Sequence, residues 1–384
     1  MEEITTRTLR AQGMSPARAY AALRAKAPTR SSYLLEMTEP DERGEQRSVI
    51  GFLVKQEAAY PAACDALAEI AAGAAAMPPA SAQADVGEAC CFDVLSVVLF
   101  DAALAGHGLA PWTDLAFVGR EIRQLSSVVF DHVAGTITIT ATNPNVVERI
   151  ARVLAEAPEL APLPPAAGTD LENVFEQPPE AAFVKQLARA ERRLASGGPS
   201  RLRLGRRFSA PMRGADPFDV MRALRETAPG RHVFFVEHAV SPMFPAYVVT
   251  GVARSSVRLD ASAGAAALSK ELLALLPVEE LCGSPARDAL AVWRDIAAGG
   301  IGVRGSLLVR TRPGGVVEVL VPHAMVTLEE EQLHTHGVAD VVPGRDARAH
   351  TAAAADHARA ELAAIRRAHD AAEARQAAAP APTD

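Results

Sequence analysis

The chain has 384 residues, a formal net charge of −7 and 49% hydrophobic residues. This length suits two ordinary domains or one large layered domain, and the acidic balance excludes general affinity for nucleic acid, which depends on clustered Lys and Arg. Four cysteines without a CxxC spacing fit a reduced cytoplasmic protein. The N-terminus lacks the pattern of a signal peptide, and no apolar run reaches the roughly 18 residues of a membrane helix. We therefore expect a cytoplasmic protein that binds neither nucleic acid nor membrane.

The first part of the chain predicts one helix and several short strands. The helix is expected over 15–25, because Ser15 is a good N-cap residue and a proline follows it in the first turn. Short β-rich runs predict strands at 48–54, 95–100 and 136–140, the last with polar and apolar residues in alternation. A segment rich in proline and alanine, 155–179, is predicted to be a linker.

Beyond this linker the pattern predicts helices and strands in mixture. Helices are expected at 183–194, 217–227 and 285–296. Strands are expected at 202–208, 232–237, 246–252, 302–310 and 316–322, with turn residues at 312–315 that join the last two as a hairpin. Strands grouped with hairpins and interspersed helices favour an α+β antiparallel architecture.

We divide the chain into four parts on this basis. They are an N-terminal region (1–154), the linker (155–179), a second folded region (180–376) and a disordered tail (377–384). An alanine-rich helix at 348–377 is expected just before the tail.

Three segments resemble the chorismate-utilising enzymes, the family of the anthranilate synthase large subunit. Residues 197–224 contain Arg-Arg-Phe and then Asp-Pro-Phe-Asp, and are similar to the family's "SRRF…DPFDLYRAL". Residues 31–51 resemble its "FLLES…RYSFIG" pair, and residues 128–139 its "VVFDH…G.L.L" strand-turn-strand. The resemblance implies a layered antiparallel β core with helices outside.

The resemblance has an internal gap. Residues 251–259 stand where the family has "GASPE.LVRV", and residues 277–287 where it has "PAGTVSGAPKIRA". In the family a long region between these motifs carries the catalytic helix with a magnesium-binding glutamate. Only residues 260–276 lie between them here. The resemblance therefore implies an internally deleted member that lacks part of the catalytic region, with no bound cofactor because the family's magnesium ligands are absent.

Five residues are candidates for ligand binding by their place in the family's motifs. Gly283 and Ser284 match the "SGAP" segment, His323 stands near the arginine that pairs with a substrate carboxylate, and His336 and Gly337 lie in the segment that matches the "GAGIVADS" loop. Histidine is mostly neutral near pH 7 and lacks the bidentate fork of arginine. No nucleophile or P-loop spacing is recognisable, so the catalytic residues stay unassigned.

Each candidate also has a structural interpretation. His323, His334 and His336 could bind zinc from neighbouring strands, or could be polar residues of a degraded pocket. Ser284 could contact a ligand or cap the helix that follows it. The basic run 192–207 could be a solvated surface or a contact for an anion or partner.

Two functions follow. The first is a divergent chorismate-utilising protein in aromatic amino acid or secondary-metabolite biosynthesis, with the ordinary magnesium-dependent lyase chemistry lost or rebuilt. The second is a catalytically silent small-molecule sensor or scaffold subunit. The partners that the resemblance implies are a small aromatic acid and either a separate glutaminase-type subunit or a second copy of the chain, because no glutaminase domain is visible in the sequence.

Overall fold

The structure is a computed structural model. It describes residues 4–27, 31–37, 46–62, 64–77, 93–110, 117–160, 174–211, 216–228, 231–238, 247–296, 306–329, 332–344, 346, 349–356, 358–360 and 362–363.

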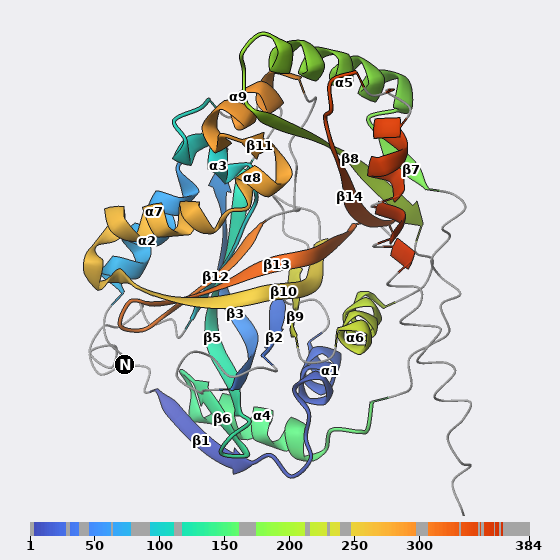
Figure 1. The fold of residues 1–384 in the computed structure, drawn as a ribbon. Helices are drawn as coiled ribbons and strands as arrows, with labels where there is room; N and C mark the ends of the chain where they lie inside the picture. The colour runs from blue at the N-terminus through green and yellow to red at the C-terminus, as the bar shows by residue number, and fades with distance from the viewer. Residues whose placement is uncertain are drawn as a thin grey trace, which may run out of the picture.

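The described residues form helices and strands in mixed order (Figure 1). The helices are α1 (Pro16–Lys26), α2 (Ala66–Ala76), α3 (Ala102–Gly106), α4 (Pro144–Ala155), α5 (Glu180–Ala195), α6 (Pro217–Thr227), α7 (Ala265–Leu275), α8 (Val278–Leu281) and α9 (Ala286–Ile296). The strands are β1 (Thr5–Arg10), β2 (Ser32–Glu36), β3 (Arg47–Pro61), β4 (Val94–Val98), β5 (Phe117–Asp131), β6 (Thr136–Ala141), β7 (Phe175–Gln177), β8 (Arg201–Pro211), β9 (His232–His238), β10 (Tyr247–Asp260), β11 (Gly283–Ser284), β12 (Leu307–Arg312), β13 (Val316–Glu329) and β14 (Gln332–Asp340).

Antiparallel pairing closes part of the sheet into a ring. The order of neighbours is β2, β3, β5, β4, β12, β13, β10, β9 and back to β2. Alternate side chains of these strands point inward and form one apolar cluster, which includes Tyr33, Ile122, Phe234 and Leu320. Strands from both sides of the segment 155–179 take part in the ring, so the two halves of the chain share one core.

A second group of strands leaves the ring where β13 and β14 separate. These two strands pair only between residues 327–329 and 332–334. From there β14 continues against β8, and β8 also pairs with β7 and β11. We call β7, β8, β11 and β14 the arm, which projects beside α5 and α9 in Figure 1.

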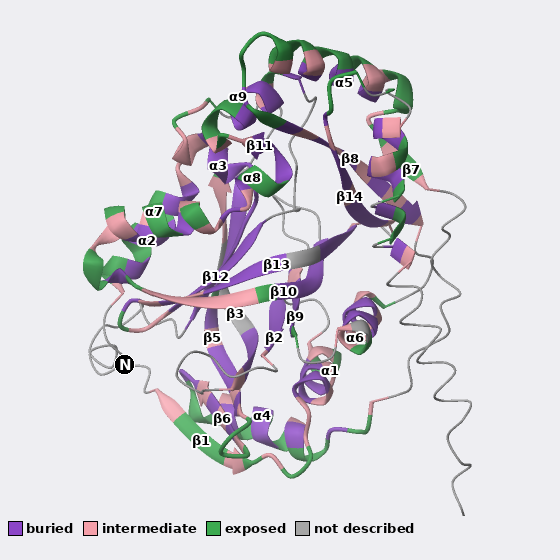
Figure 2. Ribbon diagram, viewed as in Figure 1, coloured by how far each residue is buried: buried purple, intermediate pink, exposed green. Residues whose placement is uncertain are grey.

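Helices cover the outside of the ring in two groups. One apolar cluster joins α2, α3, α5, α7, α8 and α9 to the arm and to the outer faces of β12 and β13. Another joins α1, α4 and α6 to β2, β3, β5 and β9. Figure 2 shows the buried residues concentrated on the strands and on the inner sides of these helices. The fold is thus a layered antiparallel β core with helices outside.

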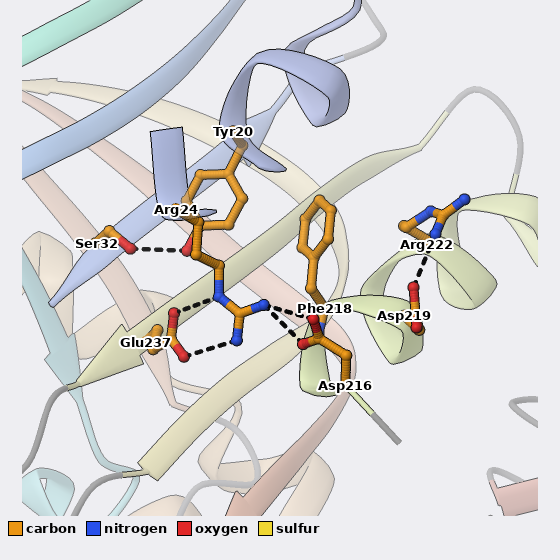
Figure 3. A network of polar contacts seen from close by, with 8 residues as sticks. All are labelled: Tyr20, Arg24, Ser32, Asp216, Phe218, Asp219, Arg222 and Glu237. Atoms are coloured by element: carbon orange, nitrogen blue, oxygen red, sulfur yellow. Dashed lines mark hydrogen bonds and ion pairs between the residues drawn. The ribbon is translucent and has the colours of Figure 1, made fainter. Parts of the chain in front are cut away.

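One polar network fastens α1 and α6 to β9 (Figure 3). The Arg24 guanidinium on α1 bonds both carboxylate oxygens of Glu237 on β9, at 2.8 and 3.0 Å, and both oxygens of Asp216 at 2.7 Å. Asp216 also caps α6 by accepting the N–H of Phe218. Beside it, the buried Tyr20 hydroxyl lies 2.8 Å from Ser32 Oγ.

Several predicted elements agree with the structure. The first helix begins at Pro16, and the Ser15 side chain accepts the N–H of Arg18, as a capping serine should. The predicted helix over 217–227 is α6, and the predicted strand over 136–140 is β6.

Other elements differ in extent. Residues 260–276 form a 3-10 turn (Ala261–Ala263) and α7, whose Leu268 and Leu272 are buried. Residues 175–177 of the predicted linker form β7 on the arm, because Phe175–Gln177 pairs with β8. The predicted strand at 302–310 is described from residue 306 and begins at Leu307. The predicted terminal helix is described at 349–356, 358–360 and 362–363, and the tail at 377–384 lies outside the described residues.

Candidate functional site

The arm carries four of the five candidate residues, and two of them, His336 and Gly337, lie side by side on β14. In the β8–β14 register His336 faces Arg207 and Gly337 faces Arg206. Residues of β8 alternate between buried and part-exposed, with Leu202, Leu204 and Arg206 on the buried side. Gly337 therefore looks into the protein, whereas His336 is half-buried on the other face of the sheet.

Gly337 is glycine for a reason of packing. A Cβ atom at this position would come within less than 3.0 Å of the Ala354 carbonyl oxygen, on the helix at 349–356, and would press on the Phe208 ring. The backbone of β14 can approach the C-terminal helix only because no side chain intervenes.

The arm buries Arg206, which lies in the Arg-Arg-Phe motif of the sequence but is not among the five candidate site residues. The Arg206 side chain is 0% exposed and lies 2.6 Å from the Glu176 carboxylate on β7. It donates to the Pro178 carbonyl at 3.0 Å and lies over the rings of Phe183 and Phe208, at 5.1 and 5.6 Å. The signal was present in the alternating pattern of 202–208, which places residue 206 on the apolar face.

A second imidazole of β14 is also engaged. His334 Nδ1 lies 2.7 Å from Ser209 Oγ on β8. Burial, and to a lesser degree the charge of Arg207, lowers the pKa of His334 to about 4. The ring is therefore neutral at physiological pH and supplies no fixed positive charge. Among the residues that the structure describes, no group of three or more His, Cys, Asp or Glu side chains is placed to hold a metal ion.

Gly283 and Ser284 lie at the other end of β8. They form β11 and pair with Leu202 and Arg201, four strand positions from Arg206, which is about 13 Å along the strand. Gly283 has φ 122°, and a Cβ there would collide with the Arg201 carbonyl oxygen, so the close approach to β8 requires glycine.

Ser284 does not cap the next helix. Its hydroxyl donates to the Glu279 carboxylate at 3.2 Å, while its carbonyl accepts the Ser200 hydroxyl at 2.9 Å. His323 belongs to β13 by its backbone, and its side chain lies outside the described part of the structure. The arm thus brings His336 and Gly337 together and holds Gly283 and Ser284 apart from them.

Both carboxylates of the arm strands face arginines. β7 supplies Glu176, which pairs with Arg206, and β14 supplies Asp340, which pairs with Arg201 at 2.8 Å and Arg203 at 3.3 Å. β8 and β11 contain no acidic residue. Each carboxylate engages its arginines through one oxygen, so a divalent cation at the arm would share that carboxylate with a guanidinium, which makes these residues a poor fit for magnesium and its oxygen ligands.

The ring, the arm and the outer helices together define a known architecture, that of chorismate-using synthases. The structure matches anthranilate synthase component I from Streptococcus pneumoniae with a TM-score of 0.60 and 15% identity, over 82% of this chain and 92% of the other. It matches MenF, the menaquinone-specific isochorismate synthase from Escherichia coli, with a TM-score of 0.63 and 10% identity, over 95% of each chain. No family model and no curated protein matches the sequence. The fold that the sequence resemblance implied is confirmed.

No helix among the described residues is long and apolar enough to cross a membrane.

Proposed function

We propose that this chain is a divergent relative of the chorismate-utilising enzymes that works in aromatic amino acid or secondary-metabolite biosynthesis without magnesium-dependent lyase chemistry. The observation that carries the proposal is the pairing of both arm carboxylates with arginines in a chain that has the fold of chorismate-using synthases. The shared fold supports a related ligand, and the ion pairs argue against the family's metal.

Arg206 makes metal binding at Glu176 energetically costly. If Glu176 turned to a metal ion, the buried guanidinium would lose its counter-charge, and breaking a buried pair typically costs about 3–5 kcal/mol. Magnesium also keeps its water shell tightly, so it gains little from a single exposed carboxylate such as Asp340. The short segment 260–276 adds no ligand to the arm, because α7 packs on α2 with its buried leucines and leaves Glu271 exposed.

A silent binding protein is the second candidate. His334 favours this candidate. Its Nδ1 is hydrogen-bonded to Ser209, and its pKa of about 4 makes it a poor general acid or base near pH 7. In this version the chain senses a small aromatic acid, or serves as a scaffold subunit in the cytoplasm for a separate glutaminase-type subunit or a second copy of itself. Light scattering of the purified chain at several concentrations tests for the second copy.

The deciding experiment is a calorimetric titration with chorismate, with and without magnesium, followed by chromatography of the same samples. Conversion that is independent of magnesium supports a rebuilt enzyme, and binding without conversion supports the silent protein. Conversion that needs magnesium overturns the proposal, and so does a lack of binding under both conditions. An Arg206→Met variant serves as a probe, because it removes the arginine partner of Glu176 and leaves the carboxylate available to a metal ion. If magnesium has no role, the titration of this variant should also be independent of magnesium.

A further inference from the structure

A hollow of about 470 Å³ is lined mainly by helices α7 and α8, and His107 at the end of α3, Arg254 of β10 and Ala286 of α9 complete its wall. Its lining contains no residue of β14, the arm strand that carries His334 and His336. Its volume is within the range of pockets for small molecules. Lys270 and residues 273–276 of its lining belong to the segment 260–276, where the resemblance to the chorismate-utilising enzymes is interrupted.

Much of the lining of the hollow is apolar. The apolar side chains are aliphatic, and they are supplied by Leu273, Ala274, Leu275, Leu276, Val278 and Ala286. Such a surface favours a ligand with a hydrocarbon or aromatic body, because the free energy of binding becomes more favourable with the apolar surface area that is removed from water.

Two cations stand on the wall with donors to spare. Among the residues that the structure describes, Arg254 makes one hydrogen bond, from Nη1 to Glu280 at 2.5 Å, and a guanidinium carries five N–H groups. Lys270 has no ion-pair partner among the described residues. These N–H groups suit a carboxylate, which arginine binds through its planar fork and lysine as a point charge.

The two acids on the wall are already engaged. Glu280 holds Arg254, and its carbonyl accepts a hydrogen bond from Arg203. Glu279 accepts the hydroxyl of Ser284. The lining carries two positive and two negative groups in total, but the negative ones are turned to partners in the protein, whereas Lys270 is left to solvent.

We propose that this hollow binds a small carboxylic acid with an aromatic or branched apolar body. The carboxylate lies toward Lys270 and the free edge of Arg254, and the body lies on the leucines of α7 and α8. The site is separate from the arm residues His336 and Gly337, and it does not depend on whether those residues act on chorismate.

The probe is 4-fluorobenzoate, whose fluorine signal reports binding by line broadening, with 4-fluorobenzamide as the uncharged analogue. The Ala274→Phe variant fills the hollow and leaves both cations in place, and Lys270→Met removes one cation. Lys185→Met on the exposed side of α5 is the matched control. We expect benzoate binding to be abolished by Ala274→Phe, weakened on the order of fivefold by Lys270→Met, and unchanged by Lys185→Met.

The hypothesis is overturned if the three variants bind 4-fluorobenzoate equally, or if the benzamide binds as tightly as the benzoate. Far-ultraviolet circular dichroism establishes that each variant is folded. A chorismate titration of Ala274→Phe separates this site from the proposed function, because chorismate bound at the arm is retained when the hollow is filled.

Discussion

Replacing Arg24 by alanine should destabilise the protein more than the loss of any single surface ion pair. The Arg24 side chain is 20% exposed and its partner Glu237 is 16% exposed, so the network is largely withdrawn from water. The change removes four bonds of 3.0 Å or less and leaves Glu237 without its counter-charge. A hydrogen bond to a charged group contributes about 1.5–3 kcal/mol net. Contributions within one network do not add, and water can replace Arg24 at the more exposed Asp216. We expect a loss of about 3 kcal/mol.

The assay is urea unfolding followed by circular dichroism, in parallel with Arg7→Ala as the control. Arg7 pairs with Glu148 on the surface, where both side chains are exposed, and should contribute less than about 1 kcal/mol. A double-mutant cycle with Glu237→Gln isolates the coupling across the network. If Arg24→Ala costs no more than Arg7→Ala, the network does not fasten α1 to β9 and our account of Figure 3 fails.

Three further changes test the arm. Gly337→Ala should displace the helix at 349–356, because its Cβ collides with the Ala354 carbonyl, and limited proteolysis should then cut the C-terminal segment faster than in the wild type. Arg206→Lys should lower the free energy of unfolding by about 2–3 kcal/mol, since lysine cannot bond Glu176 and Pro178 together while stacking on two rings; urea unfolding measures the loss, with the exposed Arg201→Lys as the control. Above its ordinary pKa of 6.5, His334 is neutral in both the folded and the unfolded chain, so its contribution to the free energy of unfolding is complete there. Between pH 6.5 and about 4 only the unfolded chain binds the proton, so the free energy of unfolding falls as the pH falls. An NMR titration that places the His334 midpoint near 6.5 would contradict this.

Local signals in the sequence predicted several elements well. Ser15 followed by proline indicated the start of α1, and Asp216 with Pro217 lies at the start of α6. Alternation over 136–140 predicted β6. In each case the signal is contained within one or two turns of chain, so propensity and capping chemistry suffice to determine it.

Closure of the ring could not be predicted in the same way. It depends on pairs such as Leu308 with Val97 and Tyr33 with Val236, which join residues about two hundred positions apart. Nothing in a single strand's pattern states its partner or register, because β-pairing is set by packing of the whole sheet. The family resemblance implied a layered antiparallel β core with helices outside, which the comparison of structures confirmed, but it did not give the partners or register of the strands.

The candidate residues do not lie together in one site, for a related reason. Gly283 and Gly337 were both chosen by motif, and both proved to border β8, but in registers four positions apart. Glycine is required at both positions because the backbone of another segment lies too close for a Cβ atom. The partner that holds Arg206 comes from residues 175–178, within a segment whose composition predicted a linker. The proline- and alanine-rich composition of this segment shows only that it lacks a regular helix or strand pattern. It does not indicate that Phe175–Gln177 pairs as a short strand with β8.

The position of the 3-10 turn at Ala261–Ala263 explains how this chain can keep the fold with a short connection. β10 has completed its pairing with β13 at Asp260, and the turn and α7 lie outside the ring. An insertion of ten glycine and serine residues between Ala263 and Gly264 should therefore cost about 1 kcal/mol or less, because the closure entropy of a loop grows slowly with its length. The same insertion after Val249, in the middle of β10, breaks the pairs with β9 and β13 and should abolish folding. Urea unfolding of the two proteins measures the difference, and equal losses would show that the turn is part of the core. If the first insertion is tolerated, the length of this connection is free to vary without loss of the ring.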